Sequence, residues 1–180
     1  MKPDNFLIKP APSFDEPVEM LRACHERIAA QCTTLEKLVV HLPLHGPNMQ
    51  AQQAARNVMR YFDVAGLHHH ADEEQNLFPM LIEISQRQCS SVGERIASLL
   101  DEHRVLEAAW AQLRTVLADI VEGKTRLLEQ VWVADFVGAY RGHIVLEESQ
   151  IFPFAEACLD RQQLARLSAT MVARRTITTQ

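Results

Sequence analysis

One short pattern occurs twice in the chain and strongly limits its fold. Residues 69–79 read HHADEEQNLFP and residues 143–153 read HIVLEESQIFP, so both match H-x-x-x-E-x-x-x-[LI]-F-P. A histidine and a glutamate four residues apart lie on the same face of an α-helix. The aliphatic–Phe pair that follows belongs in a hydrophobic core rather than in a polar loop. The repeat therefore predicts two amphipathic helices that each direct an imidazole and a carboxylate toward the interior.

Apolar residues recur at steps of three and four along four segments, which is the periodicity of helices in a bundle. We expect helices over about residues 17–42, 47–86, 91–123 and 124–149. The inward stripes are Leu21, His25, Ile28, Cys32, Leu35 and Val39 in the first helix, and Val58, Phe62, His69, Glu73 and Met80 in the second. The third contributes Ile96, Leu99, His103, Leu106, Trp110, Leu113, Leu117 and Ile120, and the fourth contributes Trp132, Phe136, Ala139, His143, Glu147 and Gln150. The predicted fold is all-α, an up-down-up-down four-helix bundle.

Prolines and glycines set most of the predicted boundaries. Pro43 is expected to end the first helix, and Pro47 is a favoured first-turn residue for the second. Pro79 is expected to kink or end the second helix. Gly123 closes the third helix, because glycine is the usual residue just after a helix C-terminus.

Two capping boxes are expected at helix starts. Ser91 and Glu94 have the spacing that opens the third helix, and Asp160 and Gln163 have the same spacing before a short fifth helix.

The chain divides into three parts on these signals. Residues 1–16 are punctuated by proline and are expected to form an extended N-terminal arm. Residues 17–158 form the bundle, and residues 159–180 form a short C-terminal helix and tail. At 180 residues with 47% hydrophobic residues, the chain is long enough to bury a core of its own.

Charge and hydropathy exclude several classes of function. The formal net charge of −5 argues against a nucleic-acid surface. No run of about 18 apolar residues occurs, and the N-terminal sequence lacks the apolar stretch of a signal peptide. Cys24, Cys32, Cys89 and Cys158 are scattered without a C-x-x-C pair, which favours reduced thiols. We expect a cytoplasmic protein with no nucleic-acid partner and no membrane partner, while its exposed helix faces leave a homo-oligomer open.

Four histidines and two glutamates lie in the inward stripes and are expected to meet. His25 and His69 are 44 residues apart, and His103 and His143 are 40 apart, so two helical hairpins can bring each pair level. Buried imidazoles and carboxylates cost several kcal/mol when nothing compensates them. A metal centre compensates all six, with the ligands His25, His69, Glu73, His103, His143 and Glu147. Two carboxylates can bridge two metals, and terminal imidazoles suit Fe, Mn or Zn.

The run of three histidines leaves the register of the second helix to be decided. His68 and His70 lie about 100° to either side of His69 on an ideal helix, so we expect them at the surface or behind the ligands. His70 and Glu74 also form an i, i+4 pair. We prefer His69 and Glu73, because their offset from the LFP triplet equals the offset in the second repeat.

Several further carboxylates lie next to the predicted ligands. Glu102, Glu107 and Glu148 are expected to be solvated, or to orient metal-bound histidines from behind. Whether Glu74, His70, Glu107 or Glu148 also ligates stays open at this point.

Two phenylalanines of the repeats are expected to border the site. Phe78 and Phe152 precede the prolines and are predicted to plug the core and limit water entry. Tyr140 lies one turn before His143 and is expected to be a packed tyrosine.

These residues together resemble the hemerythrin-like, HHE cation-binding family, of the bacterial type. The similarity covers about residues 17–155. It rests on LRACHERI around His25, DEHRVLE around His103 and the two repeats. The resemblance implies a site with two carboxylate-bridged, non-haem iron ions. It also implies that Glu73 and Glu147 bridge, with His25, His69, His103 and His143 as terminal ligands.

The pattern departs from the invertebrate oxygen carriers of this fold. Those proteins have a second histidine four residues after the helix-three ligand, where this chain has Glu107. They have an aspartate five residues after the helix-four ligand, where this chain has Glu147 at four and Glu148 at five. Bacterial proteins linked to nitric-oxide or oxygen response, iron handling and iron–sulfur repair are more similar. The repair proteins also carry an N-terminal cysteine-bearing domain, whereas no cysteine precedes Cys24 here.

The leading hypothesis is a binding protein rather than an enzyme, because the six ligands leave metal positions open and the sequence has no obvious signature of a substrate pocket. The expected function is to bind or sense O₂ or NO, or to handle iron, with Mn or Zn as other metals that suit the ligands. The alternative is a di-iron redox enzyme, or a factor that repairs iron–sulfur clusters under nitrosative or oxidative stress. A third hypothesis is a metal-free helical interaction module.

Overall fold

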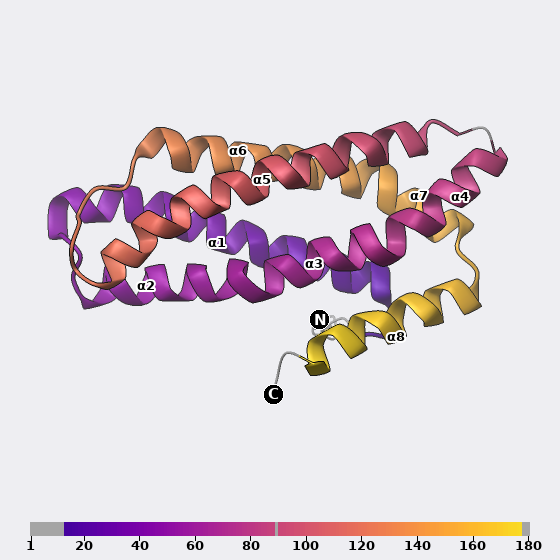
Figure 1. Ribbon diagram of the computed structural model, residues 1–180, viewed down its shortest axis with the longest axis horizontal. Helices are drawn as coiled ribbons and strands as arrows, with labels where there is room; N and C mark the ends of the chain where they lie inside the picture. Colours follow the sequence, from indigo (N-terminus) through magenta and orange to yellow (C-terminus); the bar gives the residue numbers. More distant parts are fainter. Residues whose placement is uncertain (1–12, 89, 178–180) are drawn as a thin grey trace, which may run out of the picture.

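The structure is a computed structural model that describes residues 13–88 and 90–177, and most of these residues are helical (Figure 1). No strand occurs in this part of the chain. The extended arm predicted for residues 1–16 falls mainly on residues 1–12, which lie outside the described residues, as does Cys89.

Four long helical segments run antiparallel in chain order. The first is α1 (Pro17–His45), and the third is α5 (Val92–Val121). The second joins α2 (Met49–Arg60), the π-helical turn η1 (Tyr61–Gly66), α3 (Leu67–Asp72), the π-helical turn η2 (Glu73–Leu77) and α4 (Phe78–Gln88). The fourth joins α6 (Gln130–Leu146), the π-helical turn η3 (Glu147–Ile151) and α7 (Phe152–Cys158).

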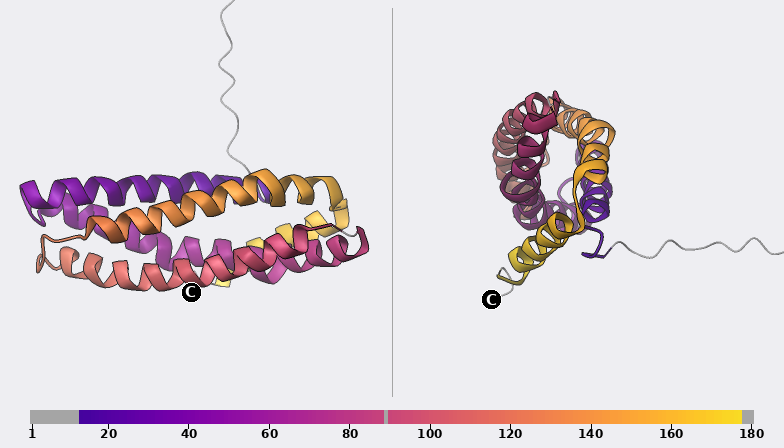
Figure 2. Two further views of the ribbon diagram at one scale, coloured as in Figure 1. Left: turned by 90° about the horizontal axis from the view of Figure 1, so that it is seen from above. Right: turned by 90° about the vertical axis from the view of Figure 1, so that its right-hand side faces the viewer.

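The four segments enclose a common core. α1 and α5 each pack against both α2 and α6, and the end-on view shows the segments arranged around one axis (Figure 2). The predicted all-α, up-down-up-down bundle is therefore confirmed. None of the helices in the described ranges is long and apolar enough to cross a membrane.

Several predicted boundaries differ from the structure. α1 continues through Pro43 to His45 and ends where Gly46 adopts a φ of 67°. The second segment begins at Met49 rather than Pro47, because the side chain of Asn48 accepts a hydrogen bond from Ala51 N, at 3.0 Å, and caps it.

The later boundaries also shift. The capping box predicted at Ser91 is wrong, since the Ser91 side chain makes no capping bond. Ser85 Oγ instead accepts a hydrogen bond from Gly93 N, at 3.1 Å. α6 begins at Gln130 rather than at residue 124, and its segment continues past Pro153 to Cys158. Gly123 closes α5 with a φ of 72°, as predicted.

Each copy of the repeated sequence pattern contains a π-helical turn, η2 in the first copy and η3 in the second. Each begins at the glutamate of the pattern and ends just before Phe-Pro. The Phe78 N–H donates to Glu73 O, and the Phe152 N–H donates to Glu147 O, five residues back in both cases. A proline ring clashes with the carbonyl four residues earlier in a regular α-helix, and a wider turn ahead of it gives the ring room. Pro79 therefore does not end the second segment.

Part of the predicted inward stripes was wrong, and the π-helical turn η3 shifts the inward face farther along the fourth segment. Met80 and Trp132 are only partly buried, and Ala139 and Gln150 are exposed. Phe136 and Ala155, both buried, are 19 residues apart. Nineteen residues of ideal α-helix turn through about 1,900°, about 100° beyond five full turns. The extra residue held in η3 removes that excess and keeps one face of α6 and α7 inward.

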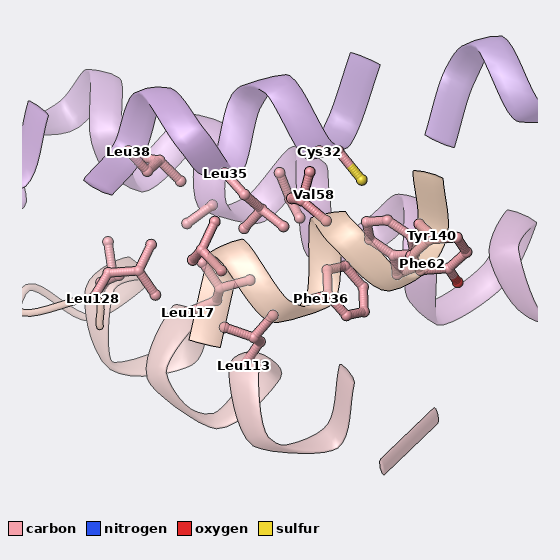
Figure 3. Packing of buried hydrophobic residues seen from close by; sticks show 14 of the residues in the cluster. Cys32, Leu35, Leu38, Val58, Phe62, Leu113, Leu117, Leu128, Phe136 and Tyr140 are labelled. Carbon is pink, nitrogen blue, oxygen red and sulfur yellow. The ribbon is translucent and has the colours of Figure 1, made fainter. Parts of the chain in front are cut away.

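Two hydrophobic clusters fill the core. The first surrounds Leu35, Val58, Leu117 and Phe136 near the α1–α2 end of the bundle (Figure 3). The second contains buried side chains from the α4–α7 end, namely Leu21, Leu77, Phe78, Ile96, Phe152 and Leu167. In all four segments the predicted site histidine lies between residues of the first cluster and residues of the second. The site therefore has a cluster of buried hydrophobic side chains on each side along the bundle axis.

A further helix, α8 (Arg161–Ile177), lies outside the four-segment bundle along α3 and η2 (Figures 1 and 2). Its predicted capping box is present. Asp160 N donates to Gln163 Oε1, at 2.9 Å, and Gln163 N donates to Asp160 Oδ1, at 2.8 Å. Leu167 and Met171 are fully buried and join α8 to the second cluster.

Two arginines of α8 hold a buried carboxylate beside the site. Asp72 is fully buried. Arg174 Nε lies 2.9 Å from Asp72 Oδ1, and Arg175 Nη1 lies 2.8 Å from Asp72 Oδ2. Arg174 Nη2 also donates to Ala71 O, at 3.2 Å, and to Asn76 Oδ1, at 2.9 Å. These contacts attach α8 to the start of η2 and compensate the charge of Asp72.

We expect Arg174→Ala to lower the free energy of unfolding by about 3 kcal/mol, because it removes one partner of a buried ion pair. Urea unfolding followed by circular dichroism measures the change. Arg166→Ala, on the exposed face of α8, is the matched control and should change stability by less than about 0.5 kcal/mol. Equal effects of the two substitutions would show that Asp72 does not depend on Arg174.

Candidate metal centre

The six predicted ligands all lie in the interior, and they come from all four segments of the bundle. His25 lies on α1, His69 and Glu73 lie on α3 and η2, His103 lies on α5, and His143 and Glu147 lie on α6 and η3. Their exposed fractions run from 0% to 2%. The structure thus brings together every residue that the sequence predicts for the site.

The six side chains form two groups that share both glutamates. His25, His69, Glu73 and Glu147 each offer a ligand atom, and these atoms lie within 4.8 Å of one another. Glu73, His103, His143 and Glu147 form a second group by the same measure. Each group could hold one metal ion, so the arrangement has room for two adjacent ions with common carboxylates.

Each glutamate directs its two oxygens to different groups. Glu147 Oε2 lies 3.0 Å from His25 Nε2, and Glu147 Oε1 lies 3.3 Å from His143 Nε2. Glu73 Oε1 lies 3.5 Å from His69 Nε2, and Glu73 Oε2 lies 3.7 Å from His103 Nε2. A carboxylate that bridges two metals needs this division of its oxygens.

Three more glutamates hold the outer nitrogens of the histidines. Glu148 Oε1 lies 2.9 Å from His25 Nδ1, and Glu102 Oε2 lies 3.0 Å from His143 Nδ1. Glu74 Oε1 lies 2.6 Å from His103 Nδ1. A carboxylate at Nδ1 keeps the proton there and turns the Nε2 lone pair inward, as in many metal sites. Glu74 therefore stands behind His103, and the fully buried Glu73 is the carboxylate that faces the interior.

Unpartnered polar atoms test whether the site suits a cation. Within the described residues, the buried side-chain nitrogens and oxygens that lack a hydrogen-bond partner are, apart from Asp72 Oδ2, all on site histidines and glutamates: His25 Nε2, His69 Nδ1 and Nε2, His70 Nε2, and both oxygens of Glu73 and of Glu147. Leaving such atoms without a partner costs about 1–3 kcal/mol each. A bound cation would satisfy most of them, so the donor set suits a metal.

When no metal is bound, the electrostatics of the site favour a neutral His69 and a protonated Glu73. Burial lowers the pKa of His69 well below its usual value. Burial raises the pKa of Glu73, and the nearby charge of Glu147 raises it further. Burial also opposes ionisation of Glu147, but the close imidazoles of His143 and His25 outweigh it and lower the pKa of Glu147. Burial lowers the pKa of His143, but the close carboxylates of Glu147 and Glu102 outweigh it and raise that pKa. A metal ion bound by Glu73 would therefore displace a proton from it, because a carboxylate must be deprotonated to bind a metal.

His70 is a buried histidine, whereas the sequence predicts it at the surface or behind the ligands. Its side chain is only 5% exposed, so a surface position is wrong. Its ring lies parallel to that of His103, with centroids 3.9 Å apart and 9° between the planes. The inward face of α3 falls between His69 and His70, so both turn to the interior while His68 stays partly exposed. The HHH run was the only sequence signal for this.

Aromatic rings border the histidines, as predicted. The Phe152 ring stacks on His25 with centroids 5.2 Å apart, and the Phe78 ring lies 6.0 Å from His103. Tyr140 packs against Phe62 and Phe136 in the first hydrophobic cluster (Figure 3). Phe152 and Phe78 thus cover one ring face of His25 and of His103 with hydrocarbon.

The burial of His70 gives a pH dependence that can be measured on metal-free protein. Burial, and then the neighbouring imidazoles of His103 and His143, lower the pKa of His70 from 6.5 to about 3. Below about pH 6.5 the unfolded chain therefore takes up a proton at this residue that the folded chain excludes. Stability from this residue is present at higher pH and is lost as the pH falls.

We expect wild type to lose up to about 1.4 kcal/mol per pH unit relative to His70→Gln as the pH falls from about 6.5 to about 5. Urea unfolding of both metal-free proteins at several pH values measures the difference. A constant difference across this range would mean that His70 protonates as easily in the folded chain as in the unfolded one.

Comparison with known proteins agrees with this geometry. The Hemerythrin HHE cation binding domain matches residues 16–155. A protein of Haemophilus influenzae that carries the name "Uncharacterized protein" is 29% identical over 165 residues, which cover 92% of this chain and 93% of the relative. The family match takes in all six predicted ligands and both repeats, and the chain belongs to the hemerythrin family of HHE cation-binding domains.

Proposed function

We propose that this protein binds two non-haem iron ions and uses them to bind or sense O₂ or NO, or to handle iron. The observation that carries the proposal is the division of the Glu73 and Glu147 oxygens between two groups of histidines. His25 and His69 would hold one iron, and His103 and His143 would hold the other. Both glutamates would bridge the two ions. The irons would supply a redox-active centre that can take up a small ligand.

The kinds of donor support iron. Imidazole nitrogens suit Fe and Zn, whereas carboxylate oxygens suit Mn and Mg, and a mixture of both is typical of non-haem iron. No thiolate belongs to either group. Burial raises the pKa of the Cys24 and Cys32 thiols, so they remain protonated packing residues. Mn and Zn suit the same donors and serve as comparison metals in the tests.

The surroundings of the site support a very small ligand. A cavity of about 20 Å³ lies beside the site, lined among others by Phe62, His70, Trp110 and Tyr140. A space of this size holds roughly one water molecule. Hydrophobic clusters close the bundle on either side of the histidines. A diatomic molecule fits this setting, whereas an organic substrate would have to displace core side chains.

The bridging role predicts the effect of removing either glutamate. Anaerobically reconstituted wild type should hold two irons per chain, and Glu73→Ala or Glu147→Ala should hold one or none. Each substitution removes a donor from both metal positions at once. Iron analysis after gel filtration measures the content, with circular dichroism to confirm the helical fold.

Glu26→Ala is the matched control, because Glu26 follows a proposed ligand in sequence but is exposed on α1. It should keep both irons. Two irons in both the Glu73 and the Glu147 variant would rule out the proposed bridges. Folded wild-type protein that binds no metal would favour a metal-free interaction module.

Ligand binding tests the functional half of the proposal. The visible spectrum of the ferrous protein should change on addition of O₂ or NO, with a stoichiometry no greater than one molecule per site. Zinc-loaded protein, which cannot change oxidation state, should show no change. If the visible spectrum of the iron-loaded protein changes with neither O₂ nor NO, iron handling is the remaining function.

The same preparation separates binding from catalysis. Repeated consumption of NO or peroxide in the presence of a chemical reductant would show a redox enzyme, whereas a single equivalent taken up per site would show a binding protein or sensor. We expect the second result.

A further inference from the structure

His70 is the buried imidazole that the six-ligand set leaves unused. Its side chain is 5% exposed, and its Nε2 is buried without a hydrogen-bond partner. A buried nitrogen in that state costs about 1–3 kcal/mol, and packing alone could be supplied by a phenylalanine or leucine. A metal ion bound in the site would give this nitrogen a partner.

The position of His70 brings it to one of the two metal positions. His70, His103 and His143 each offer a nitrogen, and the three nitrogens lie within 4.8 Å of one another. The Nε2 atoms of His103 and His143 are 3.0 Å apart. Two nitrogens that bind one ion at about 2.1 Å, at right angles, are also about 3.0 Å apart. Opposite ligands are about 4.2 Å apart, so His70 needs to move little to join them.

The orientation of the ring defines that movement. The His70 and His103 rings are parallel, at 9° and 3.9 Å, so their lone pairs point side by side rather than toward one point. A rotation of the His70 ring would direct its Nε2 to the ion between His103 and His143. The cavity of about 20 Å³ that His70 lines with Phe62 and Tyr140 gives the ring space to turn.

The contacts of His70 differ from those of three other imidazoles of the site. Within residues 13–88 and 90–177, no hydrogen bond or ion pair joins His70 to a carboxylate, whereas the imidazoles of His25, His103 and His143 each have one at Nδ1.

We propose that His70 is a fifth imidazole ligand, which binds the metal held by His103 and His143. The inference rests on the proposed two-metal site. With both shared glutamates, the His103–His143 position then has five protein donors and the His25–His69 position has four. The two positions are unequal, and the position with His70 binds its metal more tightly.

Nitrogen NMR of zinc-loaded protein tests the proposal without any need for activity. Zinc is diamagnetic, and binding at Nε2 shifts the ¹⁵N resonance of that nitrogen away from its position in a neutral, metal-free ring. We expect the Nε2 resonance of His70 to shift on zinc addition together with those of His25, His69, His103 and His143. The spectrum of His70→Phe identifies the resonance.

The possible outcomes separate this inference from the proposed function. A His70 resonance that stays in place while the other four shift overturns the inference and leaves the two-metal site intact. Five unmoved resonances overturn both. A shift of all five supports both.

Metal affinity provides a second test, because it changes if His70 binds the metal and does not change if its ring only stacks on His103. His70→Phe keeps an aromatic ring against His103 but removes the nitrogen. We expect it to weaken the tighter of the two zinc dissociation constants about tenfold to a hundredfold, as measured by chelator competition. The two constants should then move closer together.

His45→Phe makes the same change at an exposed residue at the end of α1 and should leave both constants as in wild type. Unchanged constants in His70→Phe would show that the ring of His70 only stacks. If His70→Phe does not fold, the number of Nε2 resonances that zinc shifts in wild type still decides, because the proposal requires five and the six-ligand set requires four.

Discussion

The constraint that most limits the bundle is a buried set of imidazoles and carboxylates that only a cation would fully compensate. His25, His69, Glu73 and Glu147 meet in a hydrophobic interior with several of their nitrogens and oxygens unpartnered. Helix packing alone would favour leucines in these positions, because unpartnered polar atoms oppose folding. A bound metal would make the contribution of these polar atoms to the folding free energy favourable instead of unfavourable. Since a preformed site does not exist in the unfolded chain, part of the binding free energy becomes folding free energy.

The second consequence concerns helix geometry. A regular α-helix cannot keep inward residues spaced at four over a long segment, because its face drifts by about 40° with each such step. The π-helical turns η2 and η3 absorb the drift where Glu73 and Glu147 enter the site. The Phe-Pro pair after each turn places Phe78 or Phe152 against a histidine. The same local arrangement, used twice, thus brings a glutamate into the site and places a phenylalanine against a histidine.

The sequence was sufficient for the features that depend on local spacing. An i, i+4 histidine–glutamate pair at the same offset from Phe-Pro in both repeats was enough to find His69, Glu73, His143 and Glu147. The helical periodicity around His103 was equally direct.

Features that depend on helix phase or on distant partners were harder to predict. His70 was misplaced because a rotation set by the whole segment decides whether an adjacent residue faces in. The pairing of Asp72 with Arg174 joins residues about 100 positions apart and has no local pattern. The late start of α6 was also missed, since Lys124, Leu127 and Leu128 are good helix formers that stay outside the helix in the connection from α5.

The distribution of charge around the site explains why so many carboxylates surround it. Glu73 and Glu147 contribute two negative charges, and two divalent metals would bring four positive ones. Glu74, Glu102 and Glu148 lie at the outer nitrogens of three histidines and add three negative charges just outside the donor atoms. The sum is then close to neutral, so the metals can be held in a hydrophobic interior without a large field. Asp72 would upset this balance from the next residue, and Arg174 and Arg175 of α8 compensate its charge. The arginines of α8 thereby keep the charge of Asp72 from adding to the negative charge around the site.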